Sequence, residues 1–464
     1  MGLILRFNIT CNLCELQKIL GQNIFSPILS LSPNRLDHAS YILPFFPFSL
    51  NFHPDMERAK NQLHKNQLQI NCIPSVSLWY FRVSQFFGFF PLSINPSKIS
   101  EPYIEIFSLS PIFRTLPSIY ILILIGLAIF PFFVVEADIS RFEIFSNSFH
   151  SVGRDSFRII NFLGVTFGNL SPMLARVDVL FQRGKFVQFW HNFTQMWDQF
   201  ESRGITNSER LEIYLRRRLI GHVIVNGFCA VLAIFGAIRY GGWDGNFENI
   251  SVTSVLLVGL DVVQNFTAVG QAFGLTLLIF FTQVYNHCLD GILDKVGKLN
   301  VPEFVNLYKL LDDQVVEFND VFNQKIILEV FYNMVLLLFF GYFTILFYKM
   351  GEIMYVLFNL YNVVVLFVWF FWLGKLCGDI TVKSGRIGKF LMYQSCLRSG
   401  DYHGFGNCCG GDKIKLLAAS IQNGPLVVEC CLFEVNLKLL VSVVATVTMY
   451  LIIIVQFLLV DISQ

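Results

Sequence analysis

The sequence has few charged side chains. Asp, Glu, Lys and Arg make up 14% of the 464 residues, whereas 54% are hydrophobic and 50 are phenylalanine. Soluble globular chains carry about 25% charged residues, so a soluble fold of this size would lack polar surface. The mean hydropathy of +0.56 agrees. The composition excludes an ordinary soluble protein, and the net charge of +1 argues against nucleic acid or another strongly charged partner.

The sequence also lacks the patterns of common catalytic and metal sites. Its eleven cysteines follow no disulfide framework, and Cys11 and Cys14 form one CxxC pair without the second pair of a zinc site. No nucleophile triad or phosphate-binding loop is recognisable. We therefore expect no enzyme activity, no cofactor and no metal.

Seven stretches are apolar enough to cross a bilayer, because a spanning helix needs about 20 apolar residues. A shorter stretch, Leu78–Leu92, contains Arg82 and Pro91 and is predicted to be a re-entrant or interfacial element before the first span. The predicted fold is all-α, a polytopic membrane protein with seven transmembrane helices. The predicted spans are Leu116–Val135, Arg158–Leu180, Leu219–Tyr240, Val252–Phe281, Ile326–Phe347, Ile353–Leu376 and Leu437–Val460.

The distribution of basic residues predicts the orientation of these spans, since Lys and Arg concentrate on the cytoplasmic side. With the amino terminus inside, only Arg141, Arg154, Arg158, Arg239 and Lys349 of the 34 Lys and Arg residues fall outside. The carboxyl terminus is then extracellular. The glycosylation sequon at Asn249 falls in a predicted outer loop, whereas an equally good sequon at Asn192 falls inside.

The chain is predicted to divide into five segments along this topology. They are a cytoplasmic amino-terminal extension (1–76), a pre-membrane interfacial segment (77–117), six transmembrane helices with their loops (118–376), a cytoplasmic linker (377–436) and a last transmembrane helix (437–464). Asp290–Asn323 has apolar residues at helical spacing and is predicted to be an amphipathic helix. Gly385–Gly424 is rich in glycine and cysteine, and we expect it to be a mobile linker.

The last span contains an amide side chain deep in an apolar run. Tyr450 is followed by five apolar residues, Leu451–Val455, and then by Gln456 and Phe457. This pattern resembles the signature that closes the last helix of insect gustatory receptors: Thr, Tyr, five hydrophobic residues, Gln, Phe. Met449 stands where the family usually has Thr. The segment Val83–Leu92 also resembles the region before the first span in these receptors, so the resemblance covers roughly residues 77–464.

The resemblance implies a ligand-gated, non-selective cation channel in the plasma membrane of a sensory neuron, with four subunits, identical or different, around one pore. An unpaired amide in hydrocarbon costs several kcal/mol, so Gln456 must face protein or water. The predicted pore and gate residues are Tyr450, Ile453, Gln456 and Phe457, with Asp461 concentrating cations at the outer mouth. Alternatively, Gln456 only forms a hydrogen bond with a neighbouring helix.

Polar residues at membrane depth are costly and tend to be functional. Several are predicted to cluster in the outer halves of the spans, among aromatic side chains that suit a sugar or another small polar tastant. The predicted ligand-binding residues are Arg158, Asn161, Asp261, Gln264, Asn265, Tyr355, Asn359 and Asn362. The alternative is that they hold the bundle together, with Asp261 paired to Arg158. Glu329 and His222 lie near inner ends of spans, where Glu329 needs only to reach the interface and His222 is a packed polar residue.

Three other functions remain as alternatives. Insect odorant receptors share the architecture. A seven-helix G-protein-coupled receptor would need the opposite orientation, and neither Asp-Arg-Tyr after the third span nor Asn-Pro-x-x-Tyr in the seventh is present. A solute transporter is disfavoured because no internal repeat is visible.

Overall fold

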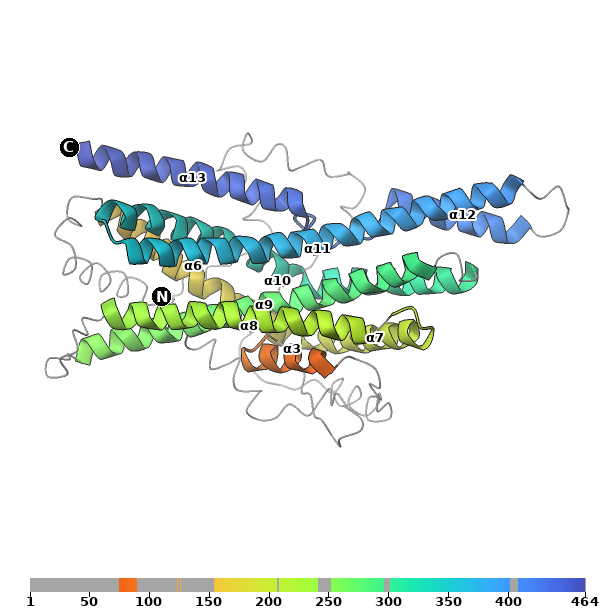
Figure 1. Cartoon of the computed structure of the whole chain (residues 1–464), viewed down its shortest axis with the longest axis horizontal. Coiled ribbons are helices and arrows are strands. Elements are labelled where there is room, and N and C mark those ends of the chain that lie inside the picture. Colours follow the sequence, from red (N-terminus) through yellow and green to blue (C-terminus); the bar gives the residue numbers. More distant parts are fainter. Residues whose placement is uncertain are drawn as a thin grey trace, which may run out of the picture. The chain divides into compact units, whose positions relative to one another are not determined.

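A computed structural model describes residues 75–89, 154–206, 208–240, 252–295, 301–400 and 408–463, together with Ile123 and Gly126. Its named elements are all helices (Figure 1), and at several helix ends, including 252–269 and 457–463, only the backbone is described. The helices are α3 (Ser75–Phe86), α6 (Arg154–Phe181), α7 (Arg183–Ser202), α8 (Ser208–Tyr240), α9 (Val252–Lys295), α10 (Val301–Met350), α11 (Ile353–Gly400), α12 (Cys408–Asn423) and α13 (Leu437–Ser463).

Six of the seven predicted spans lie within described helices, namely α6, α8, α9, α10, α11 and α13. The first, Leu116–Val135, lies outside the described residues apart from Ile123 and Gly126, which are helical. Residues 1–74 and Asn249 also lie outside them. Within the described part, the all-α prediction is confirmed.

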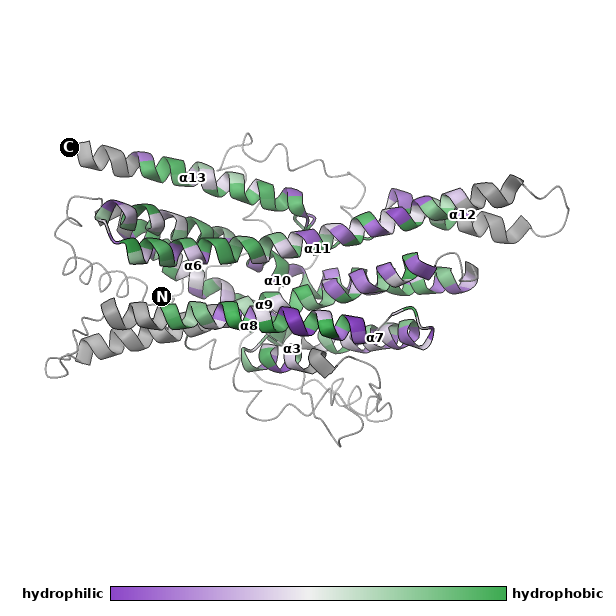
Figure 2. Ribbon diagram, in the orientation of Figure 1, coloured by the Kyte–Doolittle hydropathy of each residue, from purple (hydrophilic) through white to green (hydrophobic). Residues whose placement is uncertain are grey.

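Four described helices have stretches long and apolar enough to cross a membrane: Gly270–Lys295, Pro302–Met350, Ile353–Tyr393 and Leu437–Gln456. A helix suits lipid because it satisfies every backbone N–H and C=O within the segment. The 50 residues of α10 extend about 75 Å at 1.5 Å per residue, against about 30 Å of hydrocarbon. The long helices must therefore continue beyond the bilayer, and Figure 2 shows the matching change from hydrophobic to mixed colouring along α11.

An aromatic core joins α7 to α9 and α10. The ring of Phe281 on α9 lies 5.0 Å from that of Phe189 and 5.1 Å from that of Phe193, both on α7, measured between centroids. Phe322 of α10 lies 5.5 Å from both Phe189 and Phe281. These rings are at most 2% exposed, so α7 is fixed to the bundle although it is not itself a predicted span.

The apolar helices differ in how much of their surface the chain covers. In the apolar stretch of α9, 83% of the residues are buried, against 17% in those of α11 and α13. Exposed apolar surface on a protein of this composition must face lipid or another chain. The described part of the subunit therefore leaves most of the last helix uncovered.

The prediction of a mobile linker at Gly385–Gly424 was wrong for the described residues. α11 continues to Gly400, and α12 covers Cys408–Asn423 and packs against it. Ile387 and Ile421 are buried at this contact. A Cβ atom on Gly388 would lie 2.9 Å from Cγ2 of Ile421, so this glycine permits a close helix approach instead of providing flexibility.

The predicted amphipathic helix Asp290–Asn323 was partly right. The segment is shared between the end of α9, at Lys295, and the start of α10, at Val301, with 296–300 outside the described residues. Along α10, residues at helical spacing are buried, as the pattern indicated: Phe304, Leu307, Leu311, Val315 and Phe318.

Candidate functional site

The last helix, α13, starts at a capped end and packs along one face. The side-chain Oδ1 of Asn436 accepts hydrogen bonds from the backbone N–H groups of Lys438 (2.9 Å) and Leu439 (3.2 Å), which satisfies two of the free donors at the helix start. Leu440, Val443 and Val447 are buried in a cluster with residues of α10 and α11. Their spacing of three and four residues places them on one face of α13.

The opposite face of α13 is exposed. Met449 and Ile453 are each 40% exposed, and Gln456 is also exposed. The predicted gate residues Ile453 and Gln456 therefore share an uncovered face of the subunit, and Tyr450 is 37% exposed beside it. Phe457 and Asp461 lie on the helix, but their side chains are outside the described residues.

Further along α13, a second cluster links this helix to α10. A Cβ atom on Gly341 of α10 would lie 2.8 Å from Cδ1 of Leu451, so the absence of a side chain lets the two helices approach closely. Leu451 and Ile454 of α13 pack against a buried cluster that includes Phe343 and Phe347 of α10. We call this group the aromatic link, and it also contains Ile160, Tyr342 and Leu346 with the partly buried Phe339, Met350, Tyr355 and Val356.

The aromatic link reaches two helices that carry predicted ligand-binding residues. The ring of Phe347 lies 5.1 Å from that of Tyr355 on α11 and 5.8 Å from that of Phe343. Ile160 of α6 is a buried member of the aromatic link, and the next residue, Asn161, is 4% exposed. The start of α6 and the start of α11 therefore meet on the same part of α10.

The remaining predicted ligand residues are placed less completely. The amide of Asn359 donates to the Tyr355 carbonyl (2.7 Å) and that of Asn362 to the Phe358 carbonyl (2.9 Å), both within α11. Arg158 is half-buried on α6. Asp261, Gln264 and Asn265 lie on α9, but their side chains are outside the described residues, so the pairing of Asp261 with Arg158 stays a prediction.

Three buried charged residues form a second polar site that the sequence analysis missed. Arg176 of α6, Lys325 of α10 and Glu329 of α10 are 0%, 1% and 2% exposed. Glu329 accepts a 2.6 Å hydrogen bond from the amide of Gln271 on α9 and a 3.4 Å one from that of Asn333. The expectation that Glu329 reaches the interface was therefore wrong, because α6 and α9 cover this part of α10.

The same buried site holds the turn that follows α3. Arg176 Nε donates to the Phe87 carbonyl (2.9 Å), and the guanidinium lies 4.3 Å from the centroid of the Phe89 ring. The Lys325 ammonium lies 4.8 Å from the same centroid, a distance at which a cation is attracted to a ring face. Gly88 adopts φ 80° between the two phenylalanines, a conformation that favours glycine. Charged residues within or next to two apolar segments, Arg176 on α6 and Lys325 and Glu329 on α10, were the available signal.

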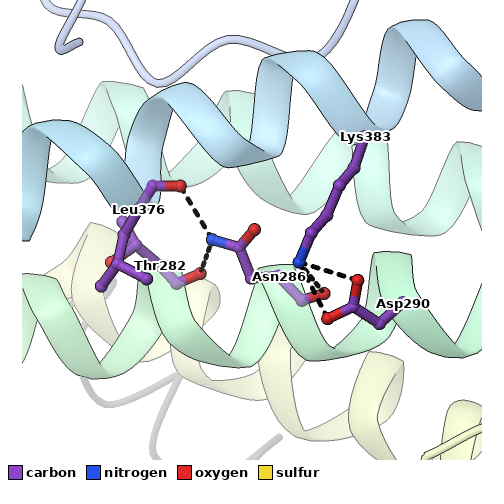
Figure 3. Close-up of polar contacts among 5 residues, drawn as sticks. All are labelled: Thr282, Asn286, Asp290, Leu376 and Lys383. Carbon is purple, nitrogen blue, oxygen red and sulfur yellow. Dashed lines mark hydrogen bonds and ion pairs between the residues drawn. The ribbon is translucent and has the colours of Figure 1, made fainter. Parts of the chain in front are cut away.

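Beyond this site, polar contacts fix α9 to its neighbours (Figure 3). The amide of Asn286 donates to the carbonyls of Thr282 (3.0 Å) and of Leu376 on α11 (2.8 Å), and Lys383 pairs with Asp290 at 2.8 Å. His222 of α8 is buried, with Nε2 lying 3.0 Å from the Ala272 carbonyl oxygen. The prediction of a packed polar residue at His222 is thus confirmed.

These features define a class: a multi-pass helical membrane protein whose helices extend past the bilayer and whose last helix exposes a polar position. Residues 79–460 match the family of 7tm Chemosensory receptors. The chain belongs to this family. It is therefore an all-helical, multi-pass membrane protein of the chemosensory receptor fold, and it is not an enzyme.

Solved structures of an insect receptor have a similar fold. The olfactory receptor OR5 from Machilis hrabei in complex with eugenol matches with a TM-score of 0.57 and 13% identity, over 82% of this chain and 98% of that chain. Another structure of OR5 from the same insect matches with a TM-score of 0.55 and 11% identity, over 87% and 100%. No curated protein sequence matches this chain.

Proposed function

We propose that this chain is a subunit of a gustatory-type, ligand-gated, non-selective cation channel. The observation that carries the proposal is the exposed face of α13, on which Gln456 follows Met449 and Ile453. An amide at membrane depth needs a polar partner or water. Four copies of α13 around a common axis would supply that water in a pore, with apolar Ile453 and Phe457 closing it by dewetting.

A small tastant, such as a sugar, binds in this proposal among the outer halves of the helices. Arg158 and Asn161 on α6 and Tyr355, Asn359 and Asn362 on α11 contribute hydrogen-bonding groups beside the aromatic link. Asp261, Gln264 and Asn265 on α9 complete the set. The OR5 structure with eugenol supports a small-molecule ligand in this fold.

The aromatic link provides the proposed connection between ligand and gate. It contacts α6 and α11 near the ligand residues and α13 at Leu451 and Ile454. The proposal compares two arrangements of the subunit, one with α13 at the pore axis and one with the rings shifted and α13 moved away from that axis. A ligand that binds the second arrangement more tightly favours the open pore. A ligand without such a preference would not open the channel.

The proposed assembly is a homo- or heterotetramer in the plasma membrane of a sensory neuron. Its amino terminus is cytoplasmic and its carboxyl terminus extracellular, as the distribution of basic residues favours. Asp461, repeated around the axis, then lies at the outer mouth and attracts cations.

Whole-cell recording with a broad tastant panel tests this proposal. We expect ligand-evoked inward current from cells that express the chain, and Gln456→Ala to change the half-maximal ligand concentration by about fivefold or more, or the reversal potential, at equal surface level. Gln422→Ala, which removes an exposed amide from α12, is the matched control and should leave both unchanged.

Three results would redirect the assignment. Surface-expressed receptor without ligand-evoked current, alone or with other chemoreceptor subunits, would contradict the channel. Saturable ligand uptake without current would favour a transporter. Activation by volatile odorants but by no tastant would favour the odorant-receptor alternative.

A further inference from the structure

Two cations from different helices converge on one tryptophan. The guanidinium of Arg218 on α8 lies 3.6 Å from the centroid of the Trp372 ring on α11, and the ammonium of Lys375 lies 5.5 Å from it. Nε of Arg218 also donates a 3.2 Å hydrogen bond to the hydroxyl of Tyr214. The indole and the phenol therefore hold two positive charges near each other.

In the described part of the chain, no carboxylate forms an ion pair with either cation. Asp379 follows Lys375 by one helical turn but does not pair with it. Arg217, next to Arg218, is exposed. Adjacent cations that repel one another and have no ion-pair partner among the described residues create a local positive potential that attracts anions.

The location of these cations is the edge of the apolar part of both helices. On α8, the exposed Ile220 and Ile224 lie three and seven residues beyond Arg217, on the same face. On α11, the exposed Phe371 precedes Lys375 by four residues. Tryptophan and basic residues at such an edge mark the level of lipid headgroups. Figure 2 shows the change in hydropathy along α8 and α11.

We propose that Arg217, Arg218 and Lys375 bind the phosphate of an anionic membrane lipid at the seam between α8 and α11. Trp372 positions two of the three cations, and the acyl chains lie along the exposed apolar side chains of the two helices. These apolar side chains favour a lipid over free phosphate, because a soluble anion has no acyl chain to contact them. The proposal depends on the membrane-spanning fold and not on ion conduction.

Lipid binding to the full-length protein in phosphatidylcholine nanodiscs tests the proposal, with labelled phosphatidylinositol 4,5-bisphosphate as the probe. We expect the double variant Arg218→Gln/Lys375→Gln to weaken binding roughly tenfold or more, as loss of two cations near a headgroup implies. The matched control, Arg386→Gln/Lys389→Gln, removes two exposed charges elsewhere on α11 and should change binding by less than about twofold. Lys375→Gln alone, at an exposed position, provides the test if the double variant does not fold.

Two outcomes would overturn the proposal. One is equal loss of binding in the two double variants, which would indicate a diffuse electrostatic effect without a site. The other is displacement of the lipid by soluble inositol 1,4,5-trisphosphate as effectively as by a short-chain form of the lipid, which would assign the site to a free phosphate ligand. Neither readout requires current, so the result is independent of the channel assignment.

Discussion

Arg176, Lys325 and Glu329 are buried where α6, α9 and α10 meet. Removing a charged group from water costs free energy. Only an opposite charge and hydrogen bonds in good geometry offset that cost. Glu329 is held by the amides of Gln271 and Asn333, and Lys325 lies one helical turn before it, where the opposite charges attract. We infer that this set stabilises the helix junction and fixes the turn after α3.

At the residue scale, we expect Glu329→Ala to destabilise the protein by about 3 kcal/mol. It removes the stronger of two carboxylate interactions with the buried Lys325 ammonium and leaves only that with Asp178. The double variant Lys325→Met/Glu329→Leu removes both charges and should recover most of this loss. Thermal unfolding of the purified protein in detergent measures both. A double variant less stable than the single one would show that the two charges do not compensate each other.

At the scale of elements, the corner between α7 and α8 is held against the end of α9. Lys295 donates to the carbonyls of Arg203 and Gly204, and Gly204 adopts φ 61°. Ile205, the next residue, is 6% exposed. A Cβ atom on Gly291 of α9 would collide with the Ile205 carbonyl oxygen. The backbones of the two elements are thus in direct contact.

We therefore expect Gly291→Ala to lower the free energy of unfolding by about 1–3 kcal/mol, because backbone atoms cannot move aside as a side chain can. Gly378→Ala on α11 is the control, since a Cβ there meets nothing within 4 Å and alanine favours the helix. Thermal unfolding and surface expression compare the variants. Equal behaviour of the two would contradict the close contact at Gly291.

Sequence patterns predicted where the helices lie, but they did not predict how the helices contact one another. Apolar runs and helical spacing predicted the helices at the sites of α6, α8, α9, α10, α11 and α13. The glycines of 385–424 were interpreted as flexible because glycine lowers helix propensity. The structure reversed that interpretation at Gly388, which lies within α11 and packs closely against Ile421 of α12. This contact between two helices cannot be read from local glycine content.

At the scale of the whole molecule, orientation decides which sequon is glycosylated. With the proposed cytoplasmic amino terminus, Asn249 is extracellular and Asn192 is not. Nδ2 of Asn192 also donates to both carboxylate oxygens of Glu317, at 3.1 and 2.9 Å. The nitrogen that would carry a glycan is therefore already engaged in the folded protein.

We expect Asn249→Gln to abolish the glycosidase-sensitive mobility shift of the protein expressed in insect cells, and Asn192→Gln to leave it unchanged. Antibody access to a tag at each terminus of intact cells provides an independent check. A shift that depends on Asn192, together with an accessible amino-terminal tag, would reverse the topology and favour the G-protein-coupled alternative.

The candidate site was predictable only in part. Gln456 was identified because an amide inside an apolar helix is costly wherever that helix lies, and the exposed fraction of Ile453 and Gln456 fits an uncovered face. Aromatic residues beside the ligand residues were predicted, but the contact of the aromatic link with α13 was not. Phe347 in the fifth span and Leu451 in the last look like ordinary apolar residues. Asp261, Gln264 and Asn265 stay predictions, as do the roles of Phe457 and Asp461.

The sequence by itself showed that the chain belongs in a lipid bilayer, that its structured part is helical, and that its last span carries a family motif. Each of these depends on local hydropathy and on residues close together in the chain. Packing against other helices does not change them. Only the tertiary structure decided that Glu329 is enclosed beside Lys325, that Gly388 serves packing, and that Arg218 and Lys375 share Trp372. Those features depend on distances between helices remote in sequence, and such distances follow from packing.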